Sequence, residues 1–182
     1  QQAGKLENGQ ISLVISSNPK AYALERAAKA AIPSKVLRRK DFSDAEEYGK
    51  ALTALLENAD IGLIVLAGFM TVLPDSFCRH FENRIINVHP SLIPSFCGEG
   101  FYGLRVHEAA LAKGVKVTGA TVHFVSEVVD GGAIIAQKAV DDTPETLQKR
   151  VMQNAEWILL PQAVSDFCAG RLRVDGAIVH KN

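Results

Sequence analysis

The chain has 182 residues, of which 47% are hydrophobic and 22% are charged. This length and composition are typical of one globular domain that is large enough to bury a core, so we expect a single domain over residues 1–182. The 20 basic and 20 acidic side chains cancel. No global field therefore favours nucleic acid or an anionic membrane as a partner.

The cysteines and the apolar runs exclude several classes of protein. Cys78, Cys97 and Cys168 are odd in number and include no Cys-x-x-Cys pair, which suits free thiols and not a disulfide framework or a structural zinc site. The longest apolar run, 61–70, is too short to span a bilayer. No charged-then-apolar signal segment opens the sequence. A cytoplasmic location is therefore the default expectation.

Strands and helices are predicted to alternate through the first half of the chain. Asn18 and Pro19 supply a helix cap and a first-turn proline, and Ser43 and Glu46 have the spacing of a capping box. This order predicts an α/β fold, a single-domain, mostly parallel twisted sheet flanked by helices. The expected strands are 11–16, 35–37, 61–67 and 84–89, and the expected helices are 20–31, one that begins near 43, and 74–81.

The second half is predicted to add two longer strands, a long helix and a hairpin. The first of these strands places Thr121 and His123 on one face. Pro161 is expected to kink the long helix. The expected elements are a glycine-rich loop at 95–103, a helix at 104–113, strands at 115–125 and 133–140, a helix from Thr143-Pro144 to Gly170, and a hairpin at Asp175-Gly176.

The candidate catalytic residues stand at the end of the predicted strand 84–89. Pro90 cannot donate to a ladder, so the strand should stop at His89. Side chains two apart share a face, which puts Asn87 beside His89 at the carboxyl end, where open α/β sheets bind ligands. An amide donor next to an imidazole can hold an oxyanion and move a proton. A strand-end cap and an ordinary loop histidine also explain both residues, and the pattern alone favours that interpretation slightly.

Asp130 stands in a loop before two glycines, which permit unusual dihedrals and a close approach by backbone or ligand. A carboxylate near His89 would orient the imidazole and stabilise its charged form. An ordinary Asp-Gly turn explains the same residues, and the sequence alone favours it. His107 and His123 are better explained by packing, and no pair of histidines or cysteines has metal-ligand spacing, so no metal is predicted.

The bend at Gly68-Phe69-Met70 follows an apolar strand, so we expect it at the same sheet edge as His89. Its exposed backbone could hydrogen-bond a flat heterocycle, with Val72 and Leu73 extending an apolar wall. A hydrophobic turn packed beneath the helix at 74 is an equally good explanation.

Four segments, in this order and at compatible spacing, resemble one known family over nearly the whole chain. They are 66–70 (Leu-Ala-Gly-Phe-Met), 86–94 (Ile-Asn-Val-His-Pro-Ser-Leu-Ile-Pro), 119–125 (Gly-Ala-Thr-Val-His-Phe-Val) and 130–132 (Asp-Gly-Gly). The chain is similar to the phosphoribosylglycinamide formyltransferases. This resemblance implies transfer of the formyl group of 10-formyltetrahydrofolate to the amine of glycinamide ribonucleotide in purine biosynthesis, without a metal or a covalent enzyme intermediate.

The resemblance also implies roles for individual residues. Asn87 would donate to the oxyanion, His89 would donate to it or protonate it, and Asp130 would keep His89 charged and relay the amine proton. Small molecules are the expected partners, and a homodimer is compatible with the family. The implied ligand residues are Met70, Thr71, Val72, Leu73, Asn87, Ser126, Glu127, Val128, Val129 and Asp130 for folate, Gln153 and Glu156 for the ribonucleotide, and Thr121 and His123 in support.

The sequence departs from the family in several places. Family members begin with a strand and a Gly/Ser/Asn-rich loop that grips the ribonucleotide phosphate, and we expect both to be absent from this chain. Many members have arginine where Ala45 and Thr71 stand, which leaves open the contacts to phosphate or the folate tail there. Trp157 replaces a usual histidine.

Two other functions remain open from the sequence. Formyltetrahydrofolate deformylase has a similar domain, but usually has a second histidine where Pro90 stands and an additional N-terminal domain. A folate-binding remnant without turnover would follow from a true loss of the first strand and loop. Because Asn87, His89 and Asp130 are all present, the transferase is the preferred hypothesis.

Overall fold

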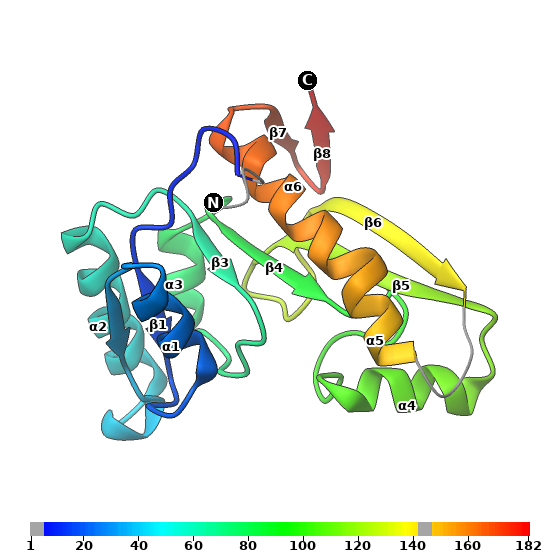
Figure 1. The fold of residues 1–182 in the computed structure, drawn as a ribbon, viewed down its shortest axis with the longest axis horizontal. Coiled ribbons are helices and arrows are strands. Elements are labelled where there is room, and N and C mark those ends of the chain that lie inside the picture. The colour runs from blue at the N-terminus through cyan, green and yellow to red at the C-terminus, as the bar shows by residue number, and fades with distance from the viewer. Residues whose placement is uncertain (1–5, 142–146) are drawn as a thin grey trace.

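The computed structural model describes residues 6–141 and 147–182, and the strands among them form two sheets (Figure 1). The smaller sheet pairs β1 (Val14–Ser16) with β2 (Ser34–Val36), and α1 (Tyr22–Lys29) connects them. The larger sheet has the order β3-β4-β5-β6-β8-β7. Its strands are β3 (Ile64–Leu66), β4 (Ile85–His89), β5 (Val117–Phe124), β6 (Ile134–Asp141), β7 (Leu172–Asp175) and β8 (Ile178–Lys181).

The structure confirms the predicted α/β class, with helices that flank the sheet. Parallel pairing joins β1 to β2, β3 to β4 and β6 to β8, and the pairs β4–β5, β5–β6 and β7–β8 are antiparallel. β1 is not hydrogen-bonded to β3, although Ile15 and Ile64 pack into one hydrophobic cluster. The helices are α2 (Ala45–Asn58), α3 (Asp75–His80), α4 (Leu104–Lys113), α5 (Leu147–Val151) and α6 (Trp157–Cys168), and a 3-10 turn spans Arg39–Asp41.

The central strand β4 divides the core by the alternation of its side chains. Ile85 packs into the cluster formed with α2 and α3, whereas Ile86 packs on the opposite side, against α6. Both isoleucines are fully buried, and each burial contributes roughly 1.5–3 kcal/mol to stability. Because side chains alternate along a strand, Asn87 and His89 share the face of Ile85.

The predicted capping box at Ser43 and Glu46 is wrong by one residue. Asp44 is the N-cap of α2, and its carboxylate accepts the N–H of Glu47 at 2.8 Å. The Glu47 carboxylate accepts the N–H of Ser43 at 2.8 Å. The carboxylate of Asp44 reaches the third amide of the helix directly, which leaves Ser43 outside the helix.

The long carboxyl-terminal helix is interrupted before Pro161 and not at it. A π-helical turn, η3 (Met152–Glu156), separates α5 from α6, and Pro161 lies inside α6. Proline has no N–H for the carbonyl of Trp157 and its ring crowds that carbonyl, so a kink at Pro161 stays a prediction. The predicted start of this helix at Thr143-Pro144 lies outside the described residues.

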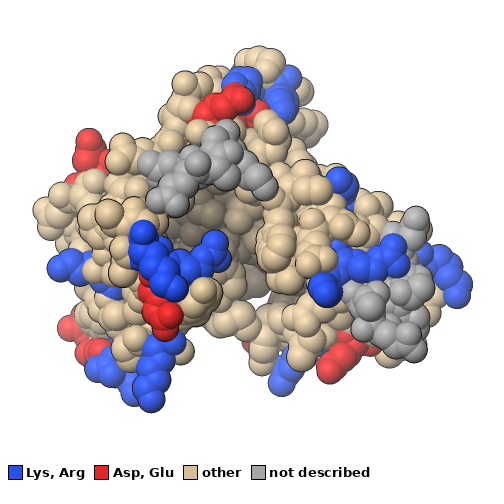
Figure 2. All heavy atoms as spheres, viewed as in Figure 1, with Lys and Arg blue, Asp and Glu red and all other residues tan. Residues whose placement is uncertain are grey.

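The predicted hairpin at Asp175-Gly176 is confirmed, with Gly176 at a φ of +57° between β7 and β8. On the face shown in Figure 2, the surface is hollowed between the side that carries α1 and α2 and the side that carries α6. Along the described ranges, every helix is too short or too polar to cross a membrane.

Candidate active site

Asn87 and His89 lie in the carboxyl-terminal half of β4, beside β5. In the antiparallel register Asn87 is opposite His123 and His89 is opposite Thr121. Asn87 Nδ2 is 3.3 Å from His123 Nε2, and His123 Nδ1 is 2.7 Å from the carbonyl oxygen of Phe124. His123 therefore donates Nδ1–H to the main chain and turns Nε2 toward the site.

Asp130 reaches the same place from the loop that connects β5 to β6. Its Oδ2 lies 3.4 Å from His89 Nδ1, and its Oδ1 lies 3.6 Å from His123 Nε2. The side chains of His89 and Asp130 are only 5% and 9% exposed. The amide, the imidazole and the carboxylate that the sequence singled out thus meet at one edge of the sheet.

The backbone of the Asp130 loop explains the two glycines that follow. Asp130 has a φ of +55°, a left-handed conformation that aspartate adopts more readily than most residues. A Cβ at Gly132 would overlap the carbonyl oxygen of Phe124. Glycine at 132 therefore lets the loop pass close to the end of β5 and carry Asp130 back to His89.

The electrostatics of the cluster favour an ionised Asp130. Burial alone would raise the pKa of its carboxyl, but the His123 imidazole, the N–H of Gly98 and the charge of His89 outweigh burial and hold the pKa below its usual value. His89 Nε2 is 2.9 Å from the carbonyl oxygen of Phe96. Because Nε2–H donates to that carbonyl, Nδ1 is the nitrogen that faces Asp130.

The two loops predicted to bind folate expose apolar side chains near this cluster. Met70, Val72 and Val128 are 59%, 69% and 68% exposed. Arg79 of α3 and Glu127 of the second loop form an ion pair at 3.7 Å, which brings the second loop against the helix that follows the first. Exposed apolar side chains beside convergent polar groups are typical of a ligand site.

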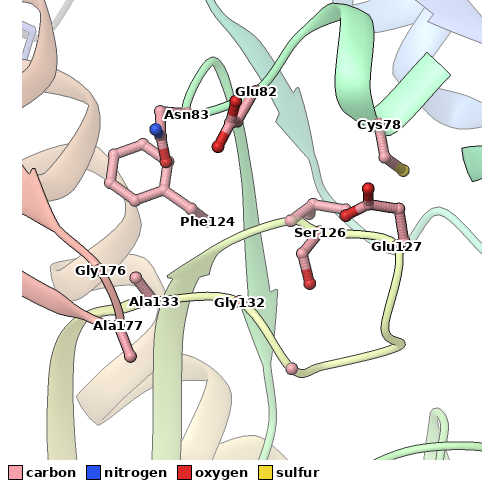
Figure 3. A pocket seen from close by; sticks show the side chains of 12 residues that line it. Cys78, Glu82, Asn83, Phe124, Ser126, Glu127, Gly132, Ala133, Gly176 and Ala177 are labelled. Carbon is pink, nitrogen blue, oxygen red and sulfur yellow. The ribbon is translucent and has the colours of Figure 1, made fainter. Parts of the chain in front are cut away.

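A cavity of about 280 Å³ lies against the loop 126–132, between the end of α3 and the β7–β8 turn (Figure 3). Ser126 and Glu127, two predicted folate residues, line it. Asn87, His89 and Asp130, the candidate catalytic cluster, do not line it, so the cavity is adjacent to this cluster and distinct from it. The other polar side chains in its wall are Cys78, Glu82 and Asn83.

Gln153 and Glu156, the predicted ribonucleotide residues, lie on the π-helical turn η3. Ala155 of this turn packs with Ala120 of β5 in a buried cluster, which holds the turn against the sheet. Burial raises the pKa of the Glu156 carboxyl, whereas Gln153 is exposed. Within the described ranges, neither side chain forms a hydrogen bond or an ion pair with the candidate catalytic cluster, so their role stays a prediction.

A family model described as formyl transferase matches residues 1–164. The chain belongs to the formyl transferase family. The cluster of Asn87, His89 and Asp130 is therefore the candidate site of formyl transfer.

This chain has relatives of very different lengths. It is 39% identical over 169 residues to a phosphoribosylglycinamide formyltransferase of Haemophilus influenzae, with 91% of this chain and 77% of the relative covered. It is 41% identical over 172 residues to the trifunctional purine biosynthetic protein adenosine-3 of Gallus gallus, with 92% of this chain covered. The chain spans only 17% of that protein.

The fold of this chain is also that of a solved relative. The crystal structure of glycinamide ribonucleotide transformylase 1 from Symbiobacterium toebii superposes with a TM-score of 0.90 at 36% identity. The match covers 99% of this chain and 84% of that one.

The sequence did not reveal three groups that contact or support the candidate catalytic cluster. They are the hydroxyl of Ser91, the carbonyl of Phe96 and the N–H of Gly98, which bonds Asp130 Oδ2 at 2.9 Å. The glycine-rich composition of 95–103 signalled a loop, but not which amide would face the carboxylate. Thr121, a predicted supporting residue, donates to the Ser91 carbonyl at 2.7 Å.

Proposed function

We propose that this formyl transferase moves the formyl group of 10-formyltetrahydrofolate onto the amine of glycinamide ribonucleotide, a step of purine biosynthesis. The observation that carries the proposal is the 3.4 Å approach of Asp130 Oδ2 to His89 Nδ1, beside the amide of Asn87. Transfer to an amine needs donors for an oxyanion and a group that moves the amine proton. The names of the Haemophilus influenzae and Symbiobacterium toebii relatives support this acceptor.

Asn87 and His89 are proposed to stabilise the oxyanion. Attack of the neutral amine forms a C–N bond and leaves negative charge on the formyl oxygen and positive charge on the amine nitrogen. Asn87 Nδ2–H and the Nδ1–H of a charged His89 can donate to that oxygen, since His89 Nε2 is already bonded to the Phe96 carbonyl. A preorganised donor of this kind contributes on the order of a hundredfold or more to turnover.

Asp130 is proposed to relay the proton. The amine nitrogen must lose a proton, and the folate nitrogen must gain one as its bond to the formyl carbon breaks. The surrounding imidazoles and the Gly98 amide hold the pKa of Asp130 low despite burial, so its carboxylate is ionised and can take the proton only transiently before passing it on. The 3.4 Å separation from His89 Nδ1 is longer than a strong hydrogen bond of about 2.7–3.2 Å, so both groups can also bind the amine or a water.

The remaining ligand contacts are assigned to the segments around the cluster. Residues 70–73 and 126–130 are proposed to hold the pterin through their backbone and exposed apolar side chains. Gln153 and Glu156 are proposed to hold the ribonucleotide, with Thr121 and His123 in support. The reaction as proposed needs no metal, and in the part of the chain that the structure describes no three His, Cys, Asp or Glu side chains are grouped as metal ligands would be.

The purified protein, incubated with 10-formyltetrahydrofolate, tests the proposal with and without glycinamide ribonucleotide. We expect one tetrahydrofolate and one formylated ribonucleotide per turnover, detected by absorbance and mass spectrometry, and only when the ribonucleotide is present. Formate released without the ribonucleotide would indicate a deformylase. Folate binding without any product would indicate a remnant without turnover, and either result contradicts the proposal.

A further inference from the structure

One short backbone segment, Phe96–Gly98, touches both reacting groups of the catalytic cluster. The carbonyl oxygen of Phe96 is 2.9 Å from His89 Nε2, and the N–H of Gly98 donates to Asp130 Oδ2 at 2.9 Å. His89 comes from β4 and Asp130 from the loop after β5. The segment therefore ties together two groups that different parts of the chain supply.

The segment is itself held in a strained conformation. Phe96 has a φ of +50°, a left-handed conformation that is unfavourable for a non-glycine residue. Its ring packs edge-on against Phe101 and against the buried cluster of Ala120. The hydroxyl of Ser91, which is fully buried, donates to the carbonyl of Ser95 and lies 3.4 Å from that of Phe96. Backbone strain of this kind persists where the surroundings fix the backbone, and such places are often functional.

We propose that the segment Phe96–Gly98 is a positioning element that fixes the His89 ring and the Asp130 carboxylate relative to each other, with Ser91 as the side chain that holds it. This inference rests on the proposed function, because it concerns the same two groups. Ser91 and Gly98 act through these groups and are positioning residues. Misplacing a reacting group by about 1 Å can cost on the order of a hundredfold in rate, so small backbone shifts here should be visible in turnover.

The amide of Gly98 also acts on the charge of Asp130. The titratable groups that face Asp130 are His89 from β4, His123 from β5 and the thiol of Cys97 from the segment itself. The N–H of Gly98 is among the interactions that offset burial and lower the pKa of Asp130. A variant that weakens the bond from Gly98 to Asp130 should raise the pKa of Asp130. As the pH is lowered, such a variant should therefore lose activity at a higher pH than the wild-type protein.

Gly98→Ala and Gly100→Ala form a matched pair. Both glycines have a positive φ, +88° and +85°, and a Cβ at either would meet nothing within 4 Å. The backbone strain is therefore alike, but of the two only Gly98 donates to Asp130. We expect Gly98→Ala to lower kcat by on the order of tenfold to a hundredfold and to leave KM for both substrates within about twofold. The acidic limb of its pH–kcat profile should move to higher pH. Gly100→Ala should do none of these.

Ser91→Ala and Ser95→Ala form a second pair, which decides the matter if Gly98→Ala fails to fold. Ser91→Ala removes the hydroxyl that holds the segment, whereas Ser95 contributes its carbonyl and keeps it in the variant. We expect a loss of kcat without a change in KM for Ser91→Ala only. Equal kinetics for the two variants would overturn the role of Ser91.

A titration of the Asp130 carboxyl by carbon-13 NMR in the ligand-free protein separates this inference from the proposed function. If the wild-type protein makes no formylated product, the proposed function is wrong, and the titration still tests whether Gly98→Ala raises the pKa of Asp130 and Gly100→Ala does not. If the wild-type protein is active and the two variants agree in both kcat and titration, the positioning role is wrong.

Discussion

The candidate catalytic cluster and the loops beside it are built in opposite ways. His89 and Asp130 are 5% and 9% exposed and are each bonded to the main chain, whereas Met70, Val72 and Val128 are more than half exposed. Groups that must be oriented for a reaction are fixed before the substrate arrives. An apolar wall can instead gain its burial from the ligand. We therefore expect that turnover and affinity for the proposed folate substrate can be changed separately.

The largest effect is expected from His89→Ala. Loss of the imidazole removes an oxyanion donor, so kcat should fall by on the order of a hundredfold or more. The apolar loops are untouched, so equilibrium folate binding should stay within about twofold. Steady-state kinetics and a fluorescence binding titration measure the two quantities. A parallel loss of binding would show that the cluster and the loops are not separable.

Asp130→Asn should lower kcat strongly and should also change how the free energy of unfolding depends on pH. Because the folded protein holds the pKa of Asp130 below its usual value, ionised Asp130 stabilises the fold above the unfolded pKa of about 4. This contribution is lost as the pH falls through the folded pKa. Urea unfolding should therefore show the wild-type protein more stable than the variant at neutral pH, with the difference shrinking in acid. A difference that grows in acid would contradict the assignment.

Val72→Ser and Val128→Ser should affect affinity and leave turnover alone. A valine buried by the ligand contributes about 1.5 kcal/mol, so KM for the folate should rise by about tenfold for each variant. Val117→Ser is the control, since Val117 is also exposed, at 53%, but lies at the far end of β5 from His123. A fall in kcat without a change in KM would assign these valines to the catalytic cluster instead.

The smallest effect is expected from Arg79→Ala. The ion pair with Glu127 at 3.7 Å joins side chains that are 62% and 42% exposed, and exposed pairs contribute about 0–1 kcal/mol. Urea unfolding should show a stability change of no more than about 0.5 kcal/mol. A double-mutant cycle with Glu127→Ala measures the coupling, and a coupling well above this range would mean that the pair fixes the second loop.

Much of the fold could be predicted because its determinants are local. Pro90 ends β4 at His89, and Asp175-Gly176 forms the closing hairpin, as their backbone chemistry requires. The ends of elements were less predictable. The expected strand 61–67 is paired only at Ile64–Leu66, because ladder length depends on the partner strand and not on the apolar run itself.

By itself the sequence determined which face of β4 carries Asn87 and His89, because alternation along a strand is a property of the backbone. It also determined that the chain after Asp130 can make a close turn, because Gly131 and Gly132 lack side chains. Only the tertiary structure decided that Asp130 meets His89, since that contact depends on the register of β4 with β5 and on the Phe96–Gly98 segment between them. Contacts between groups far apart in the chain follow from the packing of whole elements, which no local pattern encodes.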